Sequence, residues 1–231
     1  MLPSVPDVAA RPEAPSRRSW WLRLRHAVTG SVLFLVVGNL SILGVSFLTQ
    51  RIAPPAAVPV AVEGVPNLVA VDGKVWRGGA PGVVGYRSLA ASGVTTVVDL
   101  RAEDDARDLD AAAAAAGLTV LHLPVRDGQL PTDLQIAAFR QTVEDAPGTV
   151  FVHCGAGVGR TGAMSAAYLV GGGVSNERAL ARNLAVGPPS LEQIVFAAGL
   201  DDDGGIDRPS APVVAVSRVL DAPRRLWSAL R

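Results

Sequence analysis

A long apolar stretch near the N-terminus is the most pronounced feature of the hydrophobic pattern. No charged residue occurs from Ala27 to Gln50, and a helix over residues 27–48 would be about 33 Å long, close to the thickness of a bilayer core. Because the stretch shows no polar face, a buried helix of a soluble protein is the weaker alternative. We therefore predict a transmembrane helix over residues 27–48, preceded by a basic, proline-rich N-terminus (residues 1–26) that we expect to be disordered.

The charges that flank the apolar stretch predict its orientation. Five arginines precede it, whereas the twenty residues after it contain Arg51 as their only basic residue. Positively charged flanks stay on the cytoplasmic side of a membrane. We therefore expect a single-pass protein of the cell membrane with its N-terminus in the cytoplasm and the rest of the chain outside it. A cleaved signal peptide shows a similar pattern and is the alternative.

Beyond the apolar stretch, the pattern changes to that of a linker and then of a folded domain. Residues 49–66, rich in proline and alanine, are expected to form an extended linker. The next segment alternates between β-branched apolar runs and amphipathic runs. We expect a hairpin at residues 68–77 and strands at residues 94–100, 118–123 and 149–153. We expect helices at residues 102–116, at residues 132–146, where a capping box is present, and from residue 161 onward. This alternation predicts an α/β domain at residues 67–200, with a central, mostly parallel sheet of about four to five strands flanked by helices.

The last segment of the chain, residues 201–231, begins with three aspartates and ends with clustered arginines. We expect it to be a flexible tail. A short amphipathic helix on a membrane surface is the alternative, which Pro223 disfavours because proline interrupts a helix.

Composition and charge exclude several classes of function. The 231 residues carry 21 basic and 21 acidic side chains. This balance argues against nucleic-acid binding, which requires a basic surface. The single cysteine excludes an intramolecular disulfide, and the three histidines are not spaced as metal ligands. We therefore expect neither a disulfide framework nor a metal site.

The chemically informative segment runs from His153 to Gly162, where a buried strand is expected to end and a helix to begin. Three glycines within five positions allow a fold so tight that successive N–H groups point into one concavity. The dipole of the following helix favours negative charge at the same place, and the planar guanidinium of Arg160 matches the oxygens of a phosphoryl group. The pattern predicts a phosphate-binding loop made of Gly155, Ala156, Gly157, Val158, Gly159 and Arg160.

Cys154, at the base of this loop, is the predicted nucleophile. The amide groups, the helix dipole and Arg160 all favour the thiolate form of the cysteine, which can attack phosphorus in line. Thr161 is expected to donate a hydrogen bond to the sulfur and so ease its departure. His153 is expected to orient the loop rather than accept a proton. A buried, inert cysteine is the alternative, and the glycines and Arg160 argue against it.

The pattern His-Cys-x5-Arg-Thr-Gly, complete from His153 to Gly162, resembles the signature of the protein tyrosine phosphatase superfamily, in particular its compact dual-specificity branch. Weaker similarities to that branch occur at Asn67–Pro81 and at Val98–Arg101, so the resemblance covers about residues 67–200. It implies the Cys-based phosphatase fold. It also implies hydrolysis of a phosphomonoester in two steps through a cysteinyl-phosphate, without a metal or any other cofactor.

The same resemblance implies a general acid, an aspartate on a loop some thirty residues before the cysteine. Asp127 lies 27 residues before Cys154, in a segment that two prolines and a glycine mark as a loop, and we predict that it protonates the leaving group. Asp133 is the alternative, but a carboxylate in the first turn of a helix has an ordinary role there. Arg77 and Arg101 are expected to be structural.

The substrate class depends on weaker signals. Related enzymes that prefer inositol lipids tend to carry loop lysines at the places occupied here by Ala156 and Val158. The resemblance therefore favours phosphotyrosine in a phosphorylated protein, or a small phosphomonoester, as the partner of this site. Hydrolysis of phosphoinositides is one alternative, and phosphate binding without turnover, as in a pseudophosphatase, is another.

Overall fold

The computed structural model describes residues 17–103, 109–201 and 207–229 of the chain. The chain divides into two compact units, Met1–Gly38 and Asn39–Arg231. The domain predicted from the sequence lies entirely within the second unit.

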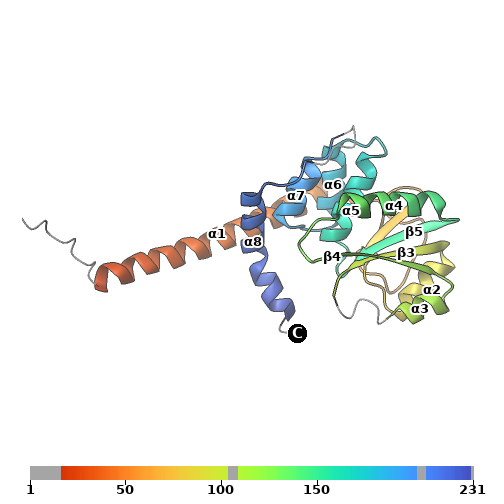
Figure 1. Cartoon of the computed structure of the whole chain (residues 1–231), viewed down its shortest axis with the longest axis horizontal. Helices are drawn as coiled ribbons and strands as arrows, with labels where there is room; N and C mark the ends of the chain where they lie inside the picture. Colours follow the sequence, from red (N-terminus) through yellow and green to blue (C-terminus); the bar gives the residue numbers. More distant parts are fainter. Residues whose placement is uncertain (1–16, 104–108, 202–206, 230–231) are drawn as a thin grey trace, which may run out of the picture. The chain divides into compact units, whose positions relative to one another are not determined.

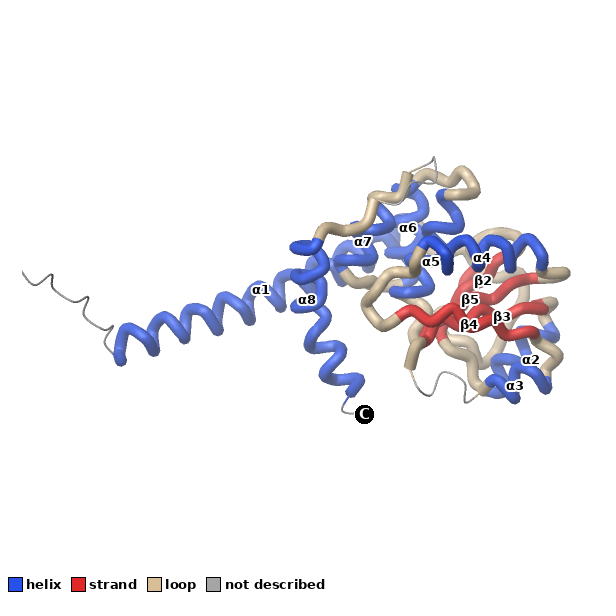
Figure 2. The backbone as a smooth tube through the Cα atoms, in the orientation of Figure 1, coloured by secondary structure: helices blue, strands red, loops and turns tan. Residues whose placement is uncertain are grey.

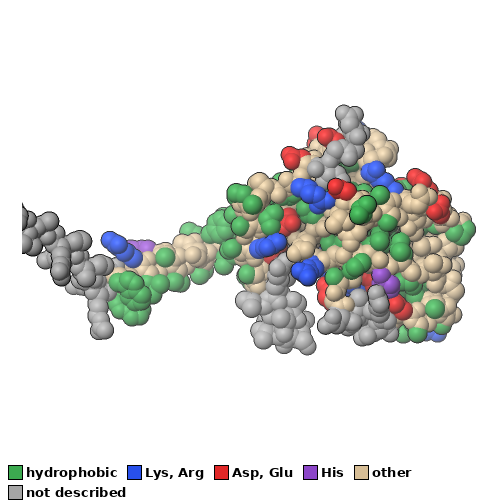
Figure 3. All heavy atoms as spheres, viewed as in Figure 1, with side chains coloured by type: hydrophobic (Ala, Val, Ile, Leu, Met, Phe, Trp, Pro, Cys, Tyr) green, Lys and Arg blue, Asp and Glu red, His purple; other side chains and the backbone are tan. Residues whose placement is uncertain are grey.

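The apolar stretch belongs to helix α1 (Arg17–Ile52), which is 36 residues long. Its segment Trp20–Ile52 is long and apolar enough to cross a membrane, a test that a signal sequence near the N-terminus also passes. Figure 3 shows hydrophobic side chains along this helix and basic side chains near its N-terminal end. Residues 17–26, predicted to be disordered, are helical because good helix formers continue the apolar stretch there. The rest of that predicted segment, residues 1–16, lies outside the described residues.

The part of α1 that belongs to the second unit makes two polar contacts with it. The Asn39 side-chain amide donates a hydrogen bond to the Leu220 carbonyl at 3.2 Å, and the buried Ser46 hydroxyl donates to the Leu184 carbonyl at 2.5 Å. A helix as long as Trp20–Ile52 measures about 50 Å, which exceeds the roughly 30 Å of a bilayer core. Asn39 and Ser46 both lie within the transmembrane segment predicted over residues 27–48, so the C-terminal part of that segment contacts the domain in this structure.

A five-stranded sheet forms the centre of the second unit (Figure 2). Its strands, in chain order, are β1 (Val69–Ala70), β2 (Val75–Gly79), β3 (Val94–Arg101), β4 (Thr119–Val125) and β5 (Thr149–Cys154). Their spatial order is β1-β2-β5-β3-β4, with β1 antiparallel to β2 and the other three neighbouring pairs parallel. The predicted mostly parallel sheet is confirmed. Because the parallel strands end at one edge, the segments that follow β2, β3, β4 and β5 meet there.

Helices cover both faces of this sheet (Figure 1). The helices that follow α1 are, in chain order, α2 (Val83–Ala91), α3 (Asp110–Ala115), α4 (Asp133–Asp145), α5 (Gly159–Val170), α6 (Asn176–Val186), α7 (Leu191–Ala198) and α8 (Ala211–Ala229), the last of which packs on α7. Helices α2 and α3 enclose a core around Trp76 and Phe151 on one face, and α4, α5 and α7 enclose a larger core around Phe139 and Phe196 on the other. The predicted capping box is present at the start of α4, where the Thr132 hydroxyl accepts from the Gln135 N–H.

The structure differs from the sequence predictions in two further segments. The helix predicted over residues 102–116 is present only as α3, with residues 104–108 outside the described residues. Glu103 is not helical, because its carboxylate binds Arg160. The predicted flexible tail contains α8. The Ser217 hydroxyl of α8 accepts a hydrogen bond from the Glu192 N–H, and Leu220 is buried, so this helix packs on the domain.

Candidate active site

The loop between β5 and α5 is held from one side. The carbonyls of its four central residues each accept a hydrogen bond from outside the loop: Gly155 from the Ala80 N–H (2.9 Å), Ala156 from the Asn67 side-chain amide (2.9 Å), and Gly157 and Val158 from Arg77 Nη2 (2.8 and 3.0 Å). In a trans peptide the N–H group points opposite to the carbonyl of the same peptide bond. The N–H groups that share these four peptide bonds, those of residues 156–159, therefore point to the opposite side of the loop. Within the described part of the chain, none of them donates a hydrogen bond. The loop thus offers a set of free donors to an anion.

Gly157 is the position of this loop at which glycine is required. Its φ is +74°, and a Cβ added there would lie 2.2 Å from the Gly78 carbonyl carbon. The loop therefore rests directly on the end of β2, which leaves no space for a side chain.

Arg160, in the first turn of α5, has a guanidinium group that is fixed on one side only. Its Nη1 lies 2.8 Å from a Glu103 carboxylate oxygen and donates to the Val125 carbonyl at 3.1 Å. Its Nη2 lies 3.4 Å from Asp127 Oδ1, and its buried Nε has no hydrogen-bond partner among the described residues. The Nε and Nη2 groups are thus positioned to bind two oxygens of one phosphate.

The ion pair between Arg160 and Glu103 keeps both groups charged. Burial opposes the charge of Arg160, but the hydrogen bond to Glu103 and the neighbouring negative charges outweigh it and raise the Arg160 pKa. Burial likewise opposes ionisation of Glu103, and the bond to Arg160 lowers the Glu103 pKa despite it. Sequence reasoning missed Glu103 because the alanine-rich segment that begins at Ala102 indicated a helix.

Cys154 lies at the base of a cleft of about 660 Å³ and is 3% exposed. The cleft is lined by residues from five segments of the chain: Ala102, Glu103, Arg126, Asp127, Gly128, Cys154, Ala156, Val158, Gly159, Arg160, Ser190, Gln193 and Asp221. Three of these segments lie at the carboxyl ends of β3, β4 and β5. The structure thus brings the predicted nucleophile, phosphate loop, arginine and acid together.

The two candidate acids differ in their positions. Asp127 lies on the loop between β4 and α4 and lines the cleft with Cys154. Asp133 does not line it; its carboxylate, in the first turn of α4, pairs with Arg208 at 2.5 Å. Geometry therefore favours Asp127. Gln193 of α7 also lines the cleft and donates a hydrogen bond to the Gln129 carbonyl at 3.2 Å, two residues beyond Asp127, which ties the acid loop to α7.

His153 and Thr161, the two residues predicted to support the nucleophile, are both buried. The Thr161 hydroxyl has no hydrogen-bond partner among the described residues, so its predicted bond to the Cys154 sulfur is not formed in this structure. The ring of His153 stacks on Phe151, and its Nδ1 lies 3.3 Å from the Cys154 carbonyl oxygen and 3.8 Å from Asp99 Oδ1. His153 therefore supports the end of β5 beneath the loop.

Burial lowers the pKa of His153 to about 4, although the charge of Asp99 opposes the shift. The imidazole of His153 then binds a proton more readily in the unfolded chain than in the folded one. The stability that neutral His153 contributes is therefore complete above about pH 6.5 and is lost as the pH falls towards 4. We expect the stability of the wild type to decrease by about 2 kcal/mol more than that of His153→Gln between pH 7 and pH 5. Urea unfolding at both pH values measures this difference, and equal decreases would contradict it.

Arg77, Arg101 and Arg126 differ in their burial and in their partners. Arg77 is buried beneath the loop and Arg101 pairs with Asp99 at 2.8 Å, as the structural roles predicted for them require. Arg126 is exposed and lines the cleft. Asp221, which sequence reasoning also missed, reaches the cleft from α8, a segment whose sequence carries no recognisable signal of such a role.

Comparison with known proteins agrees with this geometry. A family model described as DSP-PTPase phosphatase fused to NAD+ Kinase (PTP-NADK) matches residues 63–197, more than half of the chain. The chain is similar to the probable chloroplastic NAD kinase 2 of Oryza sativa subsp. japonica, with 36% identity over 95 residues, which cover 38% of this chain and 10% of that protein. It is similar also to the human dual specificity protein phosphatase CDC14C, with 39% identity over 79 residues, 33% of this chain and 17% of that protein. The chain thus spans less than a fifth of these relatives.

Among solved structures, the fold is similar to that of TpbA from P. aeruginosa, with 26% identity and a TM-score of 0.53. The match covers 66% of this chain and 94% of TpbA. Nearly the whole of that protein is therefore matched by about two thirds of this chain.

Proposed function

The chain belongs to the family of dual-specificity-phosphatase domains described as fused to NAD+ kinase, and on this premise we propose that it hydrolyses phosphomonoesters through a cysteinyl-phosphate. The observation that carries the proposal is the loop itself. Residues of this loop, whose N–H groups donate no hydrogen bond within the described part of the chain, line the same cleft as Cys154 and Arg160, and Arg160 Nε has no hydrogen-bond partner among the described residues. Donors arranged in this way bind the three outer oxygens of a phosphoryl group and stabilise the charge that develops during transfer.

In the first step, the Cys154 thiolate attacks phosphorus and a sulfur–phosphorus bond forms while the bond from phosphorus to the ester oxygen breaks. The leaving oxygen takes the proton of Asp127 and departs as an alcohol or phenol. Asp127 suits this role because it lies at the open side of Arg160, with Oδ1 3.4 Å from Nη2. Arg160 and the loop hold the phosphoryl group in line with the sulfur.

In the second step, water attacks the phosphorus of the cysteinyl-phosphate. Asp127, now a carboxylate, accepts a proton from that water, and the sulfur–phosphorus bond breaks to release phosphate and the thiolate. Thr161, buried next to the loop with a hydroxyl that has no other partner among the described residues, can turn to donate to the departing sulfur. The two steps together consume one phosphomonoester and one water molecule.

We propose singly phosphorylated substrates, phosphotyrosine in proteins above all. The phosphate loop contains no lysine, and the cleft is lined by Arg126 and Arg160 but also by three carboxylates, Glu103, Asp127 and Asp221. A substrate with several phosphates would meet these carboxylates, and like charges at short distance repel each other. A single phosphate bound by the loop avoids this repulsion.

Trapping of the intermediate tests the proposed mechanism. The full chain in detergent is mixed with a phosphotyrosine peptide that carries ³²P and is quenched in acid during turnover. We expect label on the protein, located at Cys154 by mass spectrometry of peptides, and no label on Cys154→Ser. Release of phosphate without any labelled chain would contradict the cysteinyl-phosphate, and binding of the peptide without release would indicate a pseudophosphatase.

We also propose that α1 anchors the domain in the cell membrane, with the N-terminus in the cytoplasm and the catalytic domain outside. The support is the apolar helix and the excess of arginine before it. A C-terminal reporter that fluoresces only in the cytoplasm should remain dark, and protease added to intact cells should cut the linker after Arg51. A bright reporter with a protected linker would reverse the orientation, and a chain shortened at its N-terminus would identify a cleaved signal peptide.

A further inference from the structure

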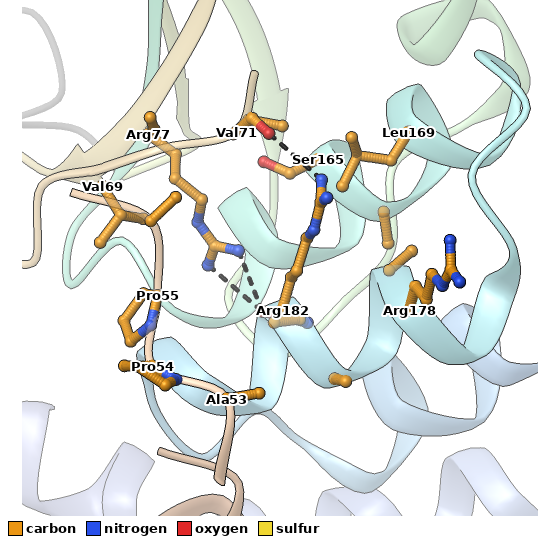
Figure 4. A pocket seen from close by; sticks show the side chains of 16 residues that line it. Ala53, Pro54, Pro55, Val69, Val71, Arg77, Ser165, Leu169, Arg178 and Arg182 are labelled. Atoms are coloured by element: carbon orange, nitrogen blue, oxygen red, sulfur yellow. Dashed lines mark hydrogen bonds between the residues drawn. The ribbon is translucent and has the colours of Figure 1, made fainter. Parts of the chain in front are cut away.

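A second cavity, of about 310 Å³, lies behind the phosphate loop, separate from the catalytic cleft. Apolar residues from the linker, β1, α5 and α6 form most of its wall: Ala53, Pro54, Pro55, Ala56, Val69, Val71, Ala166, Leu169, Ala179 and Ala181. Figure 4 shows the side chains of Arg77 and Arg182 between Pro54 and Pro55 on one side and Arg178 on the other.

The charge in this cavity is of one sign. Arg77, Arg178 and Arg182 line it, no acidic residue does, and none of the three forms a salt bridge with a described residue. Arg77 is only 3% exposed, and its guanidinium has neutral partners, the loop carbonyls and the Asn183 side-chain oxygen at 3.2 Å. Burial lowers the pKa of Arg77 and the charge of Cys154 opposes this shift, but no carboxylate lines the cavity, and several like charges around one cavity are costly.

Two buried donors in this cavity also lack acceptors. Arg77 Nε and Asn183 Nδ2 have no hydrogen-bond partner among the described residues, and Asn183 is 1% exposed. Burial lowers the pKa of Arg77 to about 10, which leaves it charged at neutral pH. The lining thus combines positive charge and unused N–H donors with apolar walls, and its volume is that of a small-molecule site.

We propose that this cavity binds the phosphate group of an organic phosphate, with the apolar part of the ligand against the linker and α5. Phosphate matches the planar guanidinium groups of Arg77 and Arg182 in charge and geometry. The phosphate can come from a soluble molecule or from the head group of an anionic lipid, since the linker that forms one wall directly follows α1.

The proposed ligand acts on catalysis through Arg77, and this second part of the inference rests on the proposed function. The same guanidinium that lines the cavity donates to the Gly157 and Val158 carbonyls of the phosphate loop. An anion behind Arg77 holds this side chain in place and so keeps the loop N–H groups turned to the substrate. We expect occupancy of the cavity to raise kcat/KM for aryl phosphates.

Binding is tested without turnover, on the full chain. The test variant is Arg178→Gln with Arg182→Gln, two exposed positions on α6, and the matched control is Arg87→Gln, an exposed arginine on α2. Equilibrium dialysis in detergent with ³²P-labelled inorganic phosphate should give about two phosphates per wild-type or control chain and about one per test variant if the ligand is soluble. Circular dichroism checks that the three proteins are equally folded.

The lipid source has its own measurement. In vesicles of phosphatidylcholine with phosphatidylglycerol, compared with phosphatidylcholine alone, the unfolding midpoint of the wild type and of Arg87→Gln should rise by about 5 °C, and that of the test variant should not. The proposal is overturned if neither phosphate nor phosphatidylglycerol distinguishes the test variant from the wild type. If the cavity binds phosphate or phosphatidylglycerol but kcat/KM does not change, only the coupling through Arg77 is overturned. If the cavity binds but the chain shows no turnover at all, the proposed function is contradicted and the binding site is not.

Discussion

Replacing Cys154 by serine should lower phosphate release from an aryl phosphate by about 10⁴-fold or more, the scale seen when an enzyme loses the nucleophile of a covalent mechanism. Serine differs from cysteine by a single atom, so the cleft keeps its shape. The hydroxyl is not ionised at neutral pH, however, and it is a far weaker nucleophile than a thiolate. The loop N–H groups and Arg160 remain, and we expect Cys154→Ser to bind phosphate or a phosphopeptide as tightly as the wild type.

The control for this experiment is binding. If Cys154→Ser loses activity and phosphopeptide binding together, the loop itself has been disturbed, and the loss says nothing about the nucleophile. A variant that still turns over at a tenth of the wild-type rate would show that water attacks phosphorus directly, and would contradict the covalent mechanism.

The loop was predictable because its chemistry is local. The glycines, Cys154 and Arg160 lie within seven consecutive residues, and the strand before them and the helix after them have clear hydrophobic patterns. Backbone constraints within such a short segment leave few arrangements of the N–H groups. The mostly parallel sheet followed from the same pattern of strands joined by helices, but the order β1-β2-β5-β3-β4 was not predicted, because it depends on pairings between strands distant in sequence.

The residues that support the loop were not predictable, because each depends on a contact distant in sequence. Glu103 was assigned to a helix by the alanines after it, and only the position of Arg160, 57 residues further along, explains why it leaves that pattern. Gln193 and Asp221 come from helices whose packing no local signal determines. The tail was judged flexible from Pro223 and its charges, and the buried Leu220 and Ser217 show that tertiary contacts outweigh that local preference.

Replacing Asp127 by asparagine should reduce the turnover of phosphate esters with poor leaving groups by about 100-fold or more, the usual contribution of a general acid. Asparagine keeps the shape of the side chain but cannot supply a proton to the leaving oxygen. The turnover of nitrophenyl phosphate should fall much less, because its phenolate leaves without protonation. The measurement is therefore a series of aryl and alkyl phosphates of increasing leaving-group pKa, in which the rate of Asp127→Asn should fall steeply along the series and that of the wild type only slightly.

Asp133→Asn is the matched control for this series, since it makes the same chemical change six residues away. Its carboxylate pairs with Arg208 and does not line the cleft, so the variant should follow the wild type for every ester. A steep series for Asp133→Asn with a flat one for Asp127→Asn would reverse the assignment. For Asp133 to act as the acid, the first turn of α4 would have to move towards Cys154. This movement would disrupt the capping box between Thr132 and Gln135. That cost is the physical reason to expect the proton from Asp127, which lies outside the capped turn of α4 and beside Arg160.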